Sequence, residues 1–179
     1  QRYLNFYPNR KNMELKDALK RLEKSDEFKN WYKKNPDNFF SYAFTLLEDK
    51  KENPWQLGYY HESTNKVVTF TVNDDSIEMQ KEEEVFKKPD MKVKKVDIEK
   101  VKIPFKDILK ITEEFRKKGY SKELVNKTMV ILQNLGSHGI IWNITYVTHA
   151  FNTLNIKVNA ESGKIMKHSL DSIMSFVKK

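Results

Sequence analysis

The most regular hydrophobic pattern in the chain lies between residues 140 and 168, where three short alternating runs are separated by turn signals. Successive side chains of a β-strand point to opposite faces, so an alternating run predicts one apolar and one polar face. Gly163 can supply the positive φ that closes a turn at residues 159–163. The stretch predicts an antiparallel meander whose third strand runs from Lys164 to His168. The apolar faces of its first two strands are Trp142, Ile144 and Tyr146, and Leu154, Ile156 and Val158.

The first ninety residues predict two helices followed by three strands. Apolar side chains three and four apart over residues 15–22 form the stripe of an amphipathic helix. Ser25 can cap a second helix, and the Asn35–Pro36 step ends it, because a residue before proline avoids the helical region. The strands are predicted at residues 39–47, 55–60 and 67–72, with a turn cluster at 62–66.

Three more helices are predicted in the second half. Pro104 is suited to the first turn of one helix, and Ser121 and Ser169 can cap the other two. Ahead of them, residues 93–103 have the spacing of an edge strand with lysines pointing outward. The predicted buried faces are Phe105, Ile108, Leu109, Thr112 and Phe115; Leu124, Val125, Thr128, Ile131, Leu132 and Leu135; and Leu170, Ile173, Met174 and Val177.

The two halves repeat the same order of elements: helix, long strand, strand, turn, strand. The segment Tyr60–Val67 aligns with Val158–Ile165, with one extra residue between the shared Glu-Ser and Lys-hydrophobic steps. This indicates a tandem duplication into residues 1–90 and 91–179, although any hairpin can produce such a likeness. The predicted fold class is α+β, with antiparallel meander sheets packed against helices as two α-β-β-β units. Whether the two units share one core stays open.

The segment Val158–Ile165 also resembles the closing hairpin of PepSY-type domains, where a strand ends in a V-D-A-x-T-G-K/E-hydrophobic turn. Asn159 and Ser162 stand where that family usually has Asp and Thr, and both residues suit a turn. The resemblance covers roughly the last third of the chain. It implies PepSY-like or cystatin-like units in which strands pack across a helix, an accessory or inhibitory role, and no catalytic residues.

Composition limits the chemistry. The 179 residues are 39% hydrophobic and 12% aromatic, as in a folded protein. The net charge of +8 favours acidic partners such as nucleic acid, anionic lipid or acidic proteins, but the lysines alternate with Glu and Asp as on a solvated surface. The absence of cysteine excludes disulfides, thiolate metal sites and cysteine nucleophiles.

Localisation is not fixed by the sequence. No apolar run approaches the roughly 20 residues that a membrane-spanning helix needs, so no transmembrane segment is predicted. The first residue is Gln1, which leaves room for an upstream leader or anchor. The cytoplasm is favoured as the compartment.

No catalytic motif, phosphate-binding glycine loop or dinucleotide fingerprint occurs in the chain. We therefore predict no catalytic residues, no metal site and no cofactor. The histidines lack metal-ligand spacing. His149, His168 and Glu161 could meet across the meander, but we interpret the histidines as strand-end residues that face water.

Aromatic side chains are the best candidates for binding. They could line the concave face of a curved sheet and hold a peptide or a small apolar ligand. The packing alternative, in which they fill the layer between sheet and helices, is favoured because Trp and Tyr bury large areas. Gly58 marks a bulge or a close approach among them. The candidate partner-binding residues are Trp55, Tyr59, Tyr60, Trp142 and Tyr146.

Three functions follow as hypotheses. The first is a non-enzymatic binding or regulatory module that engages a protein or peptide through a sheet face or edge. The second is a basic nucleic-acid-binding protein, whose affinity would fall steeply with salt. The third is a small enzyme with a cleft between the two units. Neither the partner nor the oligomeric state can be read from the sequence.

Overall fold

The structure is a computed structural model that describes residues 13–48, 53–87 and 91–176. Its three α-helices are α1 (Leu15–Lys24), α2 (Asp26–Lys34) and α3 (Phe105–Gly119), and its short 3₁₀ helices are η1 (Ile98–Lys100), η2 (Gly136–His138) and η3 (Ile173–Phe176). The strands are β1 (Phe39–Glu48), β2 (Trp55–His61), β3 (Lys66–Val72), β4 (Ile77–Met79), β5 (Glu83–Glu84), β6 (Val125–Asn134), β7 (Ile140–Thr148), β8 (Asn152–Asn159) and β9 (Ile165–Ser172).

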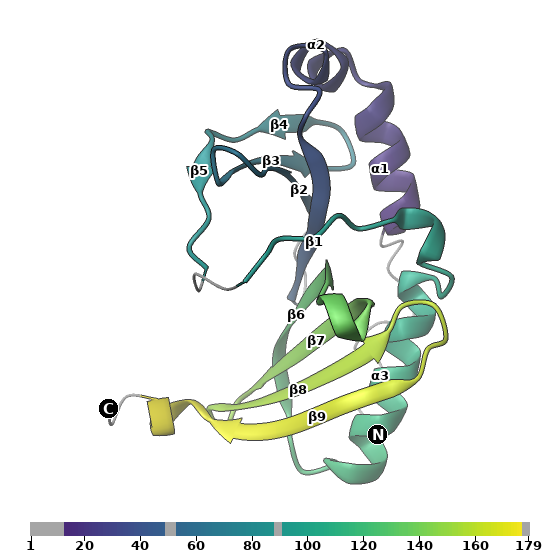
Figure 1. Ribbon diagram of the computed structural model, residues 1–179. Coiled ribbons are helices and arrows are strands. Elements are labelled where there is room, and N and C mark those ends of the chain that lie inside the picture. Colours follow the sequence, from purple (N-terminus) through teal and green to yellow (C-terminus); the bar gives the residue numbers. More distant parts are fainter. Residues whose placement is uncertain (1–12, 49–52, 88–90, 177–179) are drawn as a thin grey trace.

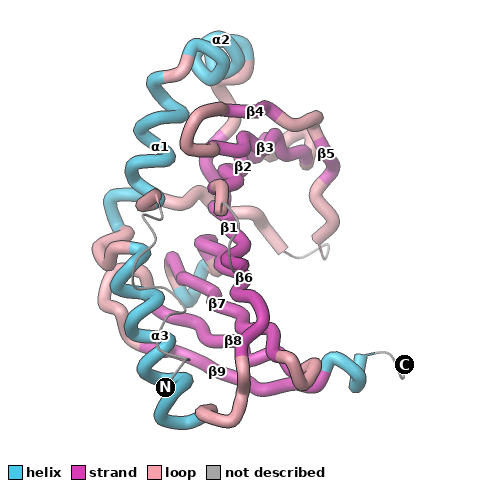
Figure 2. The backbone as a smooth tube through the Cα atoms, turned by 180° about the vertical axis from the view of Figure 1, so that it is seen from behind, coloured by secondary structure: helices cyan, strands magenta, loops and turns pink. Residues whose placement is uncertain are grey.

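All nine strands belong to one open antiparallel sheet. Its order is β4-β3-β2-β1-β6-β7-β8-β9, with β5 also pairing with β3. Helices α1 and α3 lie along the same side of this sheet (Figures 1 and 2). The predicted α+β class with antiparallel strands packed against helices is therefore confirmed. None of the helices in the described ranges has the length and apolar content to cross a bilayer.

The two halves of the chain meet at the centre of the sheet, where β1 pairs with β6. Seven residue pairs form this junction, from Tyr42 opposite Gln133 to Glu48 opposite Lys127. Buried residues from both halves belong to one hydrophobic cluster. The two halves thus share one sheet and one core. The boundary predicted after residue 90 falls beside residues 88–90, which lie outside the described ranges.

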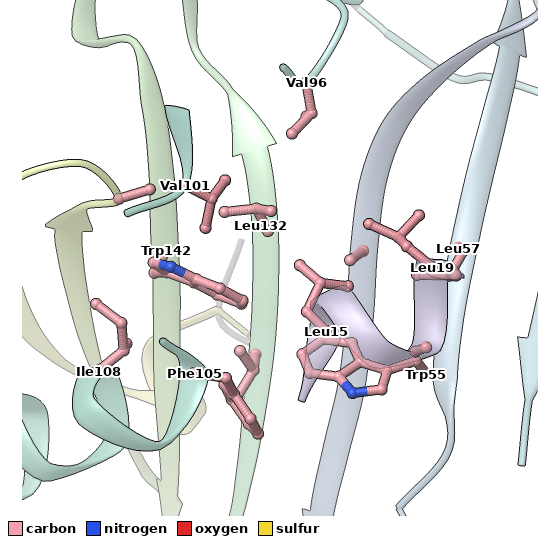
Figure 3. Close-up of a cluster of buried hydrophobic side chains, with 14 of the residues drawn as sticks. Leu15, Leu19, Trp55, Leu57, Val96, Val101, Phe105, Ile108, Leu132 and Trp142 are labelled. Atoms are coloured by element: carbon pink, nitrogen blue, oxygen red, sulfur yellow. The ribbon is translucent and has the colours of Figure 1, made fainter. Parts of the chain in front are cut away.

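Trp55 ties the halves together beneath the helices. Its ring centre lies 4.9 Å from that of Phe105 at the start of α3 and 6.2 Å from that of Trp142 on β7. Its indole N–H donates to the Met13 carbonyl at 2.8 Å. Figure 3 shows these side chains facing one another with Leu15 of α1 beside them. A β2 residue therefore packs against both helix layers and the second half of the sheet.

A second link between the halves is a helix cap. Pro104 precedes α3 and offers no side-chain cap to its first N–H groups. The Glu14 carboxylate, ahead of α1, accepts hydrogen bonds from the backbone N–H of Phe105 at 2.9 Å and of Lys106 at 3.2 Å. A negative charge at this end of a helix also interacts favourably with the helix dipole.

Most of the sequence-derived elements are confirmed. Helix α1 buries the predicted apolar stripe, and the Ser25 hydroxyl caps α2 by accepting from the Phe28 N–H at 3.2 Å. The meander occurs as β7, β8 and β9, with the predicted apolar faces buried and Gly163 at a φ of 72°.

The helix predicted from Ser121 is wrong, because this stretch forms the central strand β6. Thr128, Val130 and Leu132 are buried on the helix side, while Met129 and Ile131 are half-buried on the opposite face. A central strand with apolar residues on both faces shows no alternation, and its spacing then mimics a helix. Pairing with β1 on one side and β7 on the other decides the conformation.

Two other expectations are also wrong. Residues 93–103 form no strand and contain only η1, whereas β4 and β5 supply that edge of the sheet. The helix expected after Ser169 is instead the continuation of β9 followed by η3, because residues 167–172 pair with β8. Val177, which was assigned to that helix, lies outside the described residues.

The misassigned strand also shifted the alignment of the two halves. Each half runs from helix into four antiparallel strands, β1–β4 and β6–β9. The turn between β2 and β3 therefore corresponds to the turn between β7 and β8, and not to the β8–β9 turn to which Val158–Ile165 belongs. These two corresponding turns each hold a non-glycine residue in the left-handed region, Asn65 at a φ of 55° and Phe151 at 57°.

We predict that Glu14→Ala lowers the free energy of unfolding by about 1–2 kcal/mol, because two N–H groups of α3 lose a charged acceptor. Urea unfolding followed by circular dichroism measures this change. Glu114→Ala is the matched control, since Glu114 is an exposed carboxylate later in α3. Equal stabilities of the two variants would contradict a capping role for Glu14.

Candidate binding site on the open sheet face

The side of the sheet away from the helices carries a second set of apolar residues. Along β1 and β6, alternate positions are buried beneath the helices, and the positions between them are half-buried on the open face. Exposing such residues to water is unfavourable, so an uncovered apolar strip marks a candidate contact surface. The open-face residues of the central strands are Tyr42, Phe44, Leu46, Met129, Ile131 and Gln133.

A pocket of about 420 Å³ lies on this face. Its floor comes from β1, β2, β3 and β6, so both halves of the chain contribute. Val85, just after β5, and Val93, ahead of η1, complete the lining. The lining residues are Ser41, Tyr42, Phe44, Gln56, Tyr60, Val67, Val85, Val93, Ile131 and Gln133, none of which is charged at neutral pH.

A β-bulge at Ser41 sets which side chains reach the pocket. Phe40 pairs with Tyr59 and Tyr42 pairs with Gly58, so Ser41 has no partner residue on β2. The extra residue reverses the alternation of β1: Phe40 is buried in the core, and Tyr42 and Phe44 face the pocket. The Ser41 hydroxyl donates to the Gly58 carbonyl at 3.1 Å and fixes the bulge.

Gly58 allows Tyr42 to lie flat across the sheet. A Cβ atom at position 58 would overlap the Tyr42 ring, so only glycine leaves room for it. The ring crosses β2 and its hydroxyl group hydrogen-bonds the Thr69 hydroxyl on β3 at 2.8 Å. The sequence predicted a bulge or a close approach at Gly58, and the structure has both. The bulge is at Ser41 on the facing strand β1, and the close approach is that of the Tyr42 ring.

Tyr60 lines the pocket from β2. Its ring contacts that of Phe39 with centres 5.6 Å apart, and its hydroxyl donates to the Asn65 side-chain carbonyl at 3.0 Å. Burial, with a smaller contribution from the Glu62 carboxylate, raises the pKa of Tyr60 above its ordinary value. The Tyr60 hydroxyl therefore remains a neutral hydrogen-bond donor.

Gln56 and Gln133 bring free amide groups into this apolar setting. Neither side chain forms a hydrogen bond with any residue that the structure describes, and both are half-buried in the pocket lining. In the sheet register Phe44 is opposite Gln56 on β2 and Ile131 on β6, while Gln133 is opposite Tyr42. The two amides therefore lie on either side of β1 and can orient a ligand by hydrogen bonds.

A basic pocket adjoins the apolar one and shares Ser41, Val93 and Gln133 with it. Its volume is about 370 Å³. The neighbouring chain is anchored to the sheet, because the Val96 N–H donates to the Phe40 carbonyl at 2.9 Å and the Asn134 amide donates to the Lys95 carbonyl at 2.8 Å. The remaining lining residues are Lys87, Met91, Lys92, Lys94, Asn134, Leu135, Gly136 and Ser137.

Of the five aromatic residues chosen from the sequence, only Tyr60 lines this pocket. Four of them point between sheet and helices and are at most 5% exposed, which gives them the packing role that the sequence left as the alternative. Tyr60 is 2% exposed but faces the other side and lines the pocket. The four that a partner cannot reach in the folded chain are Trp55, Tyr59, Trp142 and Tyr146.

Sequence reasoning missed the two glutamines. A single amide in a strand carries no distinctive pattern, and Gln133 was assigned to a helix. The strand at residues 39–47 was predicted, but the sequence did not reveal which of its faces the helices cover.

The histidines form no common site. His168 lies against α3, where its Nδ1 is 2.7 Å from the Tyr120 hydroxyl and its ring centre is 4.9 Å from that of Phe115. Within the described ranges, no cluster of three or more His, Asp or Glu side chains is placed to hold a metal ion.

Comparisons with known proteins show the fold alone. No family model matches the chain, and no curated protein matches it by sequence. The structure is similar to the crystal structure of a Clostridium difficile 630 protein provisionally described as a lipoprotein, with a TM-score of 0.54 and 15% sequence identity. The match covers 82% of this chain and 91% of the other. The likeness to PepSY domains therefore stays a prediction.

We predict that Gly58→Ala destabilises the protein by about 1–3 kcal/mol, because the new methyl group displaces the Tyr42 ring. In a Tyr42→Ala background the same substitution should be neutral or stabilising, since the obstacle is gone. Urea unfolding of the parent, the two single variants and the double variant measures the coupling energy between positions 42 and 58. Gly119→Ala is the control, because nothing lies within 4 Å of its added Cβ. Additive effects of the two substitutions would contradict the ring-over-glycine arrangement.

Tyr59 gives the protein a predictable response to alkaline pH. Burial is the largest cause that raises its pKa far above the ordinary value, followed by repulsion from Glu23 and Tyr32. Below about pH 10 both the folded and the unfolded chain keep the phenol proton. Above that pH the unfolded chain loses the proton and the folded chain retains it, so stability falls as the pH rises.

We predict that this contribution reaches about 1.4 kcal/mol per pH unit above pH 10 and disappears in Tyr59→Phe. Urea unfolding of both proteins between pH 7 and pH 11.5 tests it. Lysine titration affects both curves alike, so the difference between them isolates Tyr59. Parallel curves over the whole range would contradict the prediction.

Proposed function

We propose that this protein is a non-enzymatic binding module whose open sheet face takes a peptide segment from a protein partner. A large apolar side chain of that segment enters the pocket between Tyr42, Phe44 and Ile131. Acidic residues beside it meet the lysines of the adjoining basic pocket. This keeps the sheet-face hypothesis drawn from the sequence and moves the contact residues to the opposite face.

The observation that carries the proposal is an apolar pocket with two amide groups that form no hydrogen bond with any described residue. Pockets that bind specific ligands are mostly apolar and hold a few polar groups that fix orientation. The amides of Gln56 and Gln133 each offer a donor and an acceptor, which matches the backbone of an extended peptide. The lysines beside the pocket supply charge complementarity and would speed encounter with an acidic segment.

The lining favours binding over catalysis. Among its described residues there is no carboxylate, histidine or lysine in the apolar pocket, so no group there has a pKa suited to general acid–base work near neutral pH. The pocket does span the junction between the halves, where an enzyme cleft was considered. Its floor is a continuous ladder between β1 and β6, and not an open interface.

Nucleic-acid binding remains the second candidate because of the lysines at positions 87, 92 and 94. A phosphate backbone would use these charges and leave the apolar pocket unfilled. The two functions differ in salt response, since phosphate contacts make the logarithm of affinity fall steeply with the logarithm of salt concentration.

We predict that an array of immobilised random octapeptides selects sequences with one large apolar residue next to acidic residues. Fluorescence anisotropy with the best labelled peptide should show that Ile131→Lys weakens binding by about tenfold or more, because a charge enters the apolar pocket. The matched control is Val147→Lys, which places lysine on the same sheet face, on β7 and outside the pocket.

Equal binding by the parent and Ile131→Lys would contradict the proposed site. A labelled single-stranded oligonucleotide run in the same assay separates the second candidate. Oligonucleotide binding with a steep salt dependence, combined with no peptide selection, would favour nucleic-acid binding over peptide binding as the function.

A further inference from the structure

The two edges of the sheet differ in length and charge. At one edge β4 has three residues and β5 has two, and Glu78, Glu83 and Glu84 are exposed there. Short acidic strands discourage pairing with another chain. At the other edge β9 spans eight residues without proline, and no described part of the chain pairs with its outer side.

Exposed apolar side chains gather at the β9 edge. Met166 and Leu170 on β9 are 42% and 40% exposed, and Met174 in η3 is 59% exposed. Phe151, which is 65% exposed, lies beside η3, because its carbonyl accepts the Ile173 N–H at 2.8 Å. Four of the nine large hydrophobic side chains that the described residues expose are therefore at this edge, which is the mark of a contact surface.

The charges of β9 are left unbalanced within the chain. Lys167 lies directly opposite Lys157 on β8, a like-charge pair that destabilises a sheet. Asp171 lies opposite Thr153 and has no cation across from it. Among the described residues, none forms an ion pair with Lys157, Lys167 or Asp171. Lys167 and Asp171 are four residues apart, so both side chains point to the open face.

We infer that β9 pairs antiparallel with β9 of a second copy of this chain, around a two-fold axis at Ser169. In this register Lys167 lies opposite Asp171 of the second copy, and symmetry forms the pair twice. The small Ser169 faces its own equivalent. Each carboxylate then balances the Lys157–Lys167 repulsion of the other chain.

The alternation of side chains along β9 also limits where the two-fold axis can lie. Residues directly opposite each other in an antiparallel pair must point to the same face, so a two-fold axis perpendicular to the sheet has to pass through a residue position. Moving the axis to His168 or Leu170 places Lys167 opposite Ser169 or Ile173 and loses both ion pairs. Ser169 is therefore the register that the charges select.

Such an axis keeps the open faces of both copies on the same side. The dimer would present two apolar pockets to one partner surface, which raises avidity for a partner with two matching segments. A single strand pair buries less area than a standard stable interface. The association is therefore expected to be reversible and to depend on protein concentration.

The first test uses the absence of cysteine from the chain. Cα atoms of directly opposed residues are about 4.5–5.5 Å apart, within the range that a disulfide spans. Ser169→Cys should therefore form a disulfide-linked dimer in a glutathione redox buffer. Ser172→Cys is the matched control on the same strand, because its equivalents would lie about 20 Å apart along the pair. Non-reducing electrophoresis reads both variants.

The second test reverses the charges. In sedimentation equilibrium, Lys167→Asp and Asp171→Lys should each raise the dimer dissociation constant by about tenfold, because each turns two attractions into repulsions. The double variant with both substitutions restores opposite charges and should return close to the parent value. Circular dichroism confirms that each variant is folded.

The results of these two tests either support or overturn the β9–β9 dimer. Cross-linking at 169 and not at 172, with rescue by the double charge swap, supports the interface. A monomeric parent at every concentration up to about 1 mM, equal cross-linking at the two positions, or no rescue would overturn it. Peptide binding by a monomeric parent would leave the proposed function intact, so the two proposals fail separately.

Discussion

The pairing of β1 with β6 is the interaction on which the rest of the structure depends. Each half alone would be a small sheet with a helix on one face and an unprotected long strand at its edge. Joining the two edges removes both problems and creates one sheet with a continuous core. Trp55 and the Glu14 cap then fasten the helices of the two halves to this junction. Because the junction is central, the open face over it belongs to both halves.

The Ser41 bulge determines what that face contains. Without the extra residue, the alternation of β1 would continue unchanged from Phe40, and the side chains after the bulge would exchange faces. The bulge instead places Phe40 in the core and Tyr42 and Phe44 on the open face. Gly58 opposite the bulge accepts the Tyr42 ring. One inserted residue on β1 and one missing side chain on β2 thus produce the pocket floor together.

The sequence predicted most elements but did not predict which face of the sheet the helices cover. The strands β7 and β8 were visible because one face is apolar and the other polar, as with Ile156 and Lys157. Strand β6 was mistaken for a helix because it is apolar on both faces, and this error shifted the comparison of the halves by one strand. Its long-range partners β1 and β7 decide its conformation, and local periodicity does not contain them.

The candidate site was also missed because it depends on long-range strand pairing. Aromatic content drew attention to Trp55 and Trp142, which are the largest fully buried side chains of the helix-facing layer. Large rings usually serve packing, so their number says little about binding. The residues that distinguish the open face are ordinary by type: an isoleucine, two glutamines and the residues around a bulge. Only the register of four strands brings them together.

The two glutamines explain how such a pocket can be selective. An apolar lining supplies affinity in proportion to the area it removes from water, at about 25 cal/mol per Å², whatever the shape of the guest. Amides buried by a guest without hydrogen bonds would cost about 1–3 kcal/mol each. A guest that satisfies the amides of Gln56 and Gln133 avoids that loss, and one that merely fills the space does not. Because strands hold both residues in the sheet, the spacing of the amides is fixed before any partner arrives, and the partner has to match it.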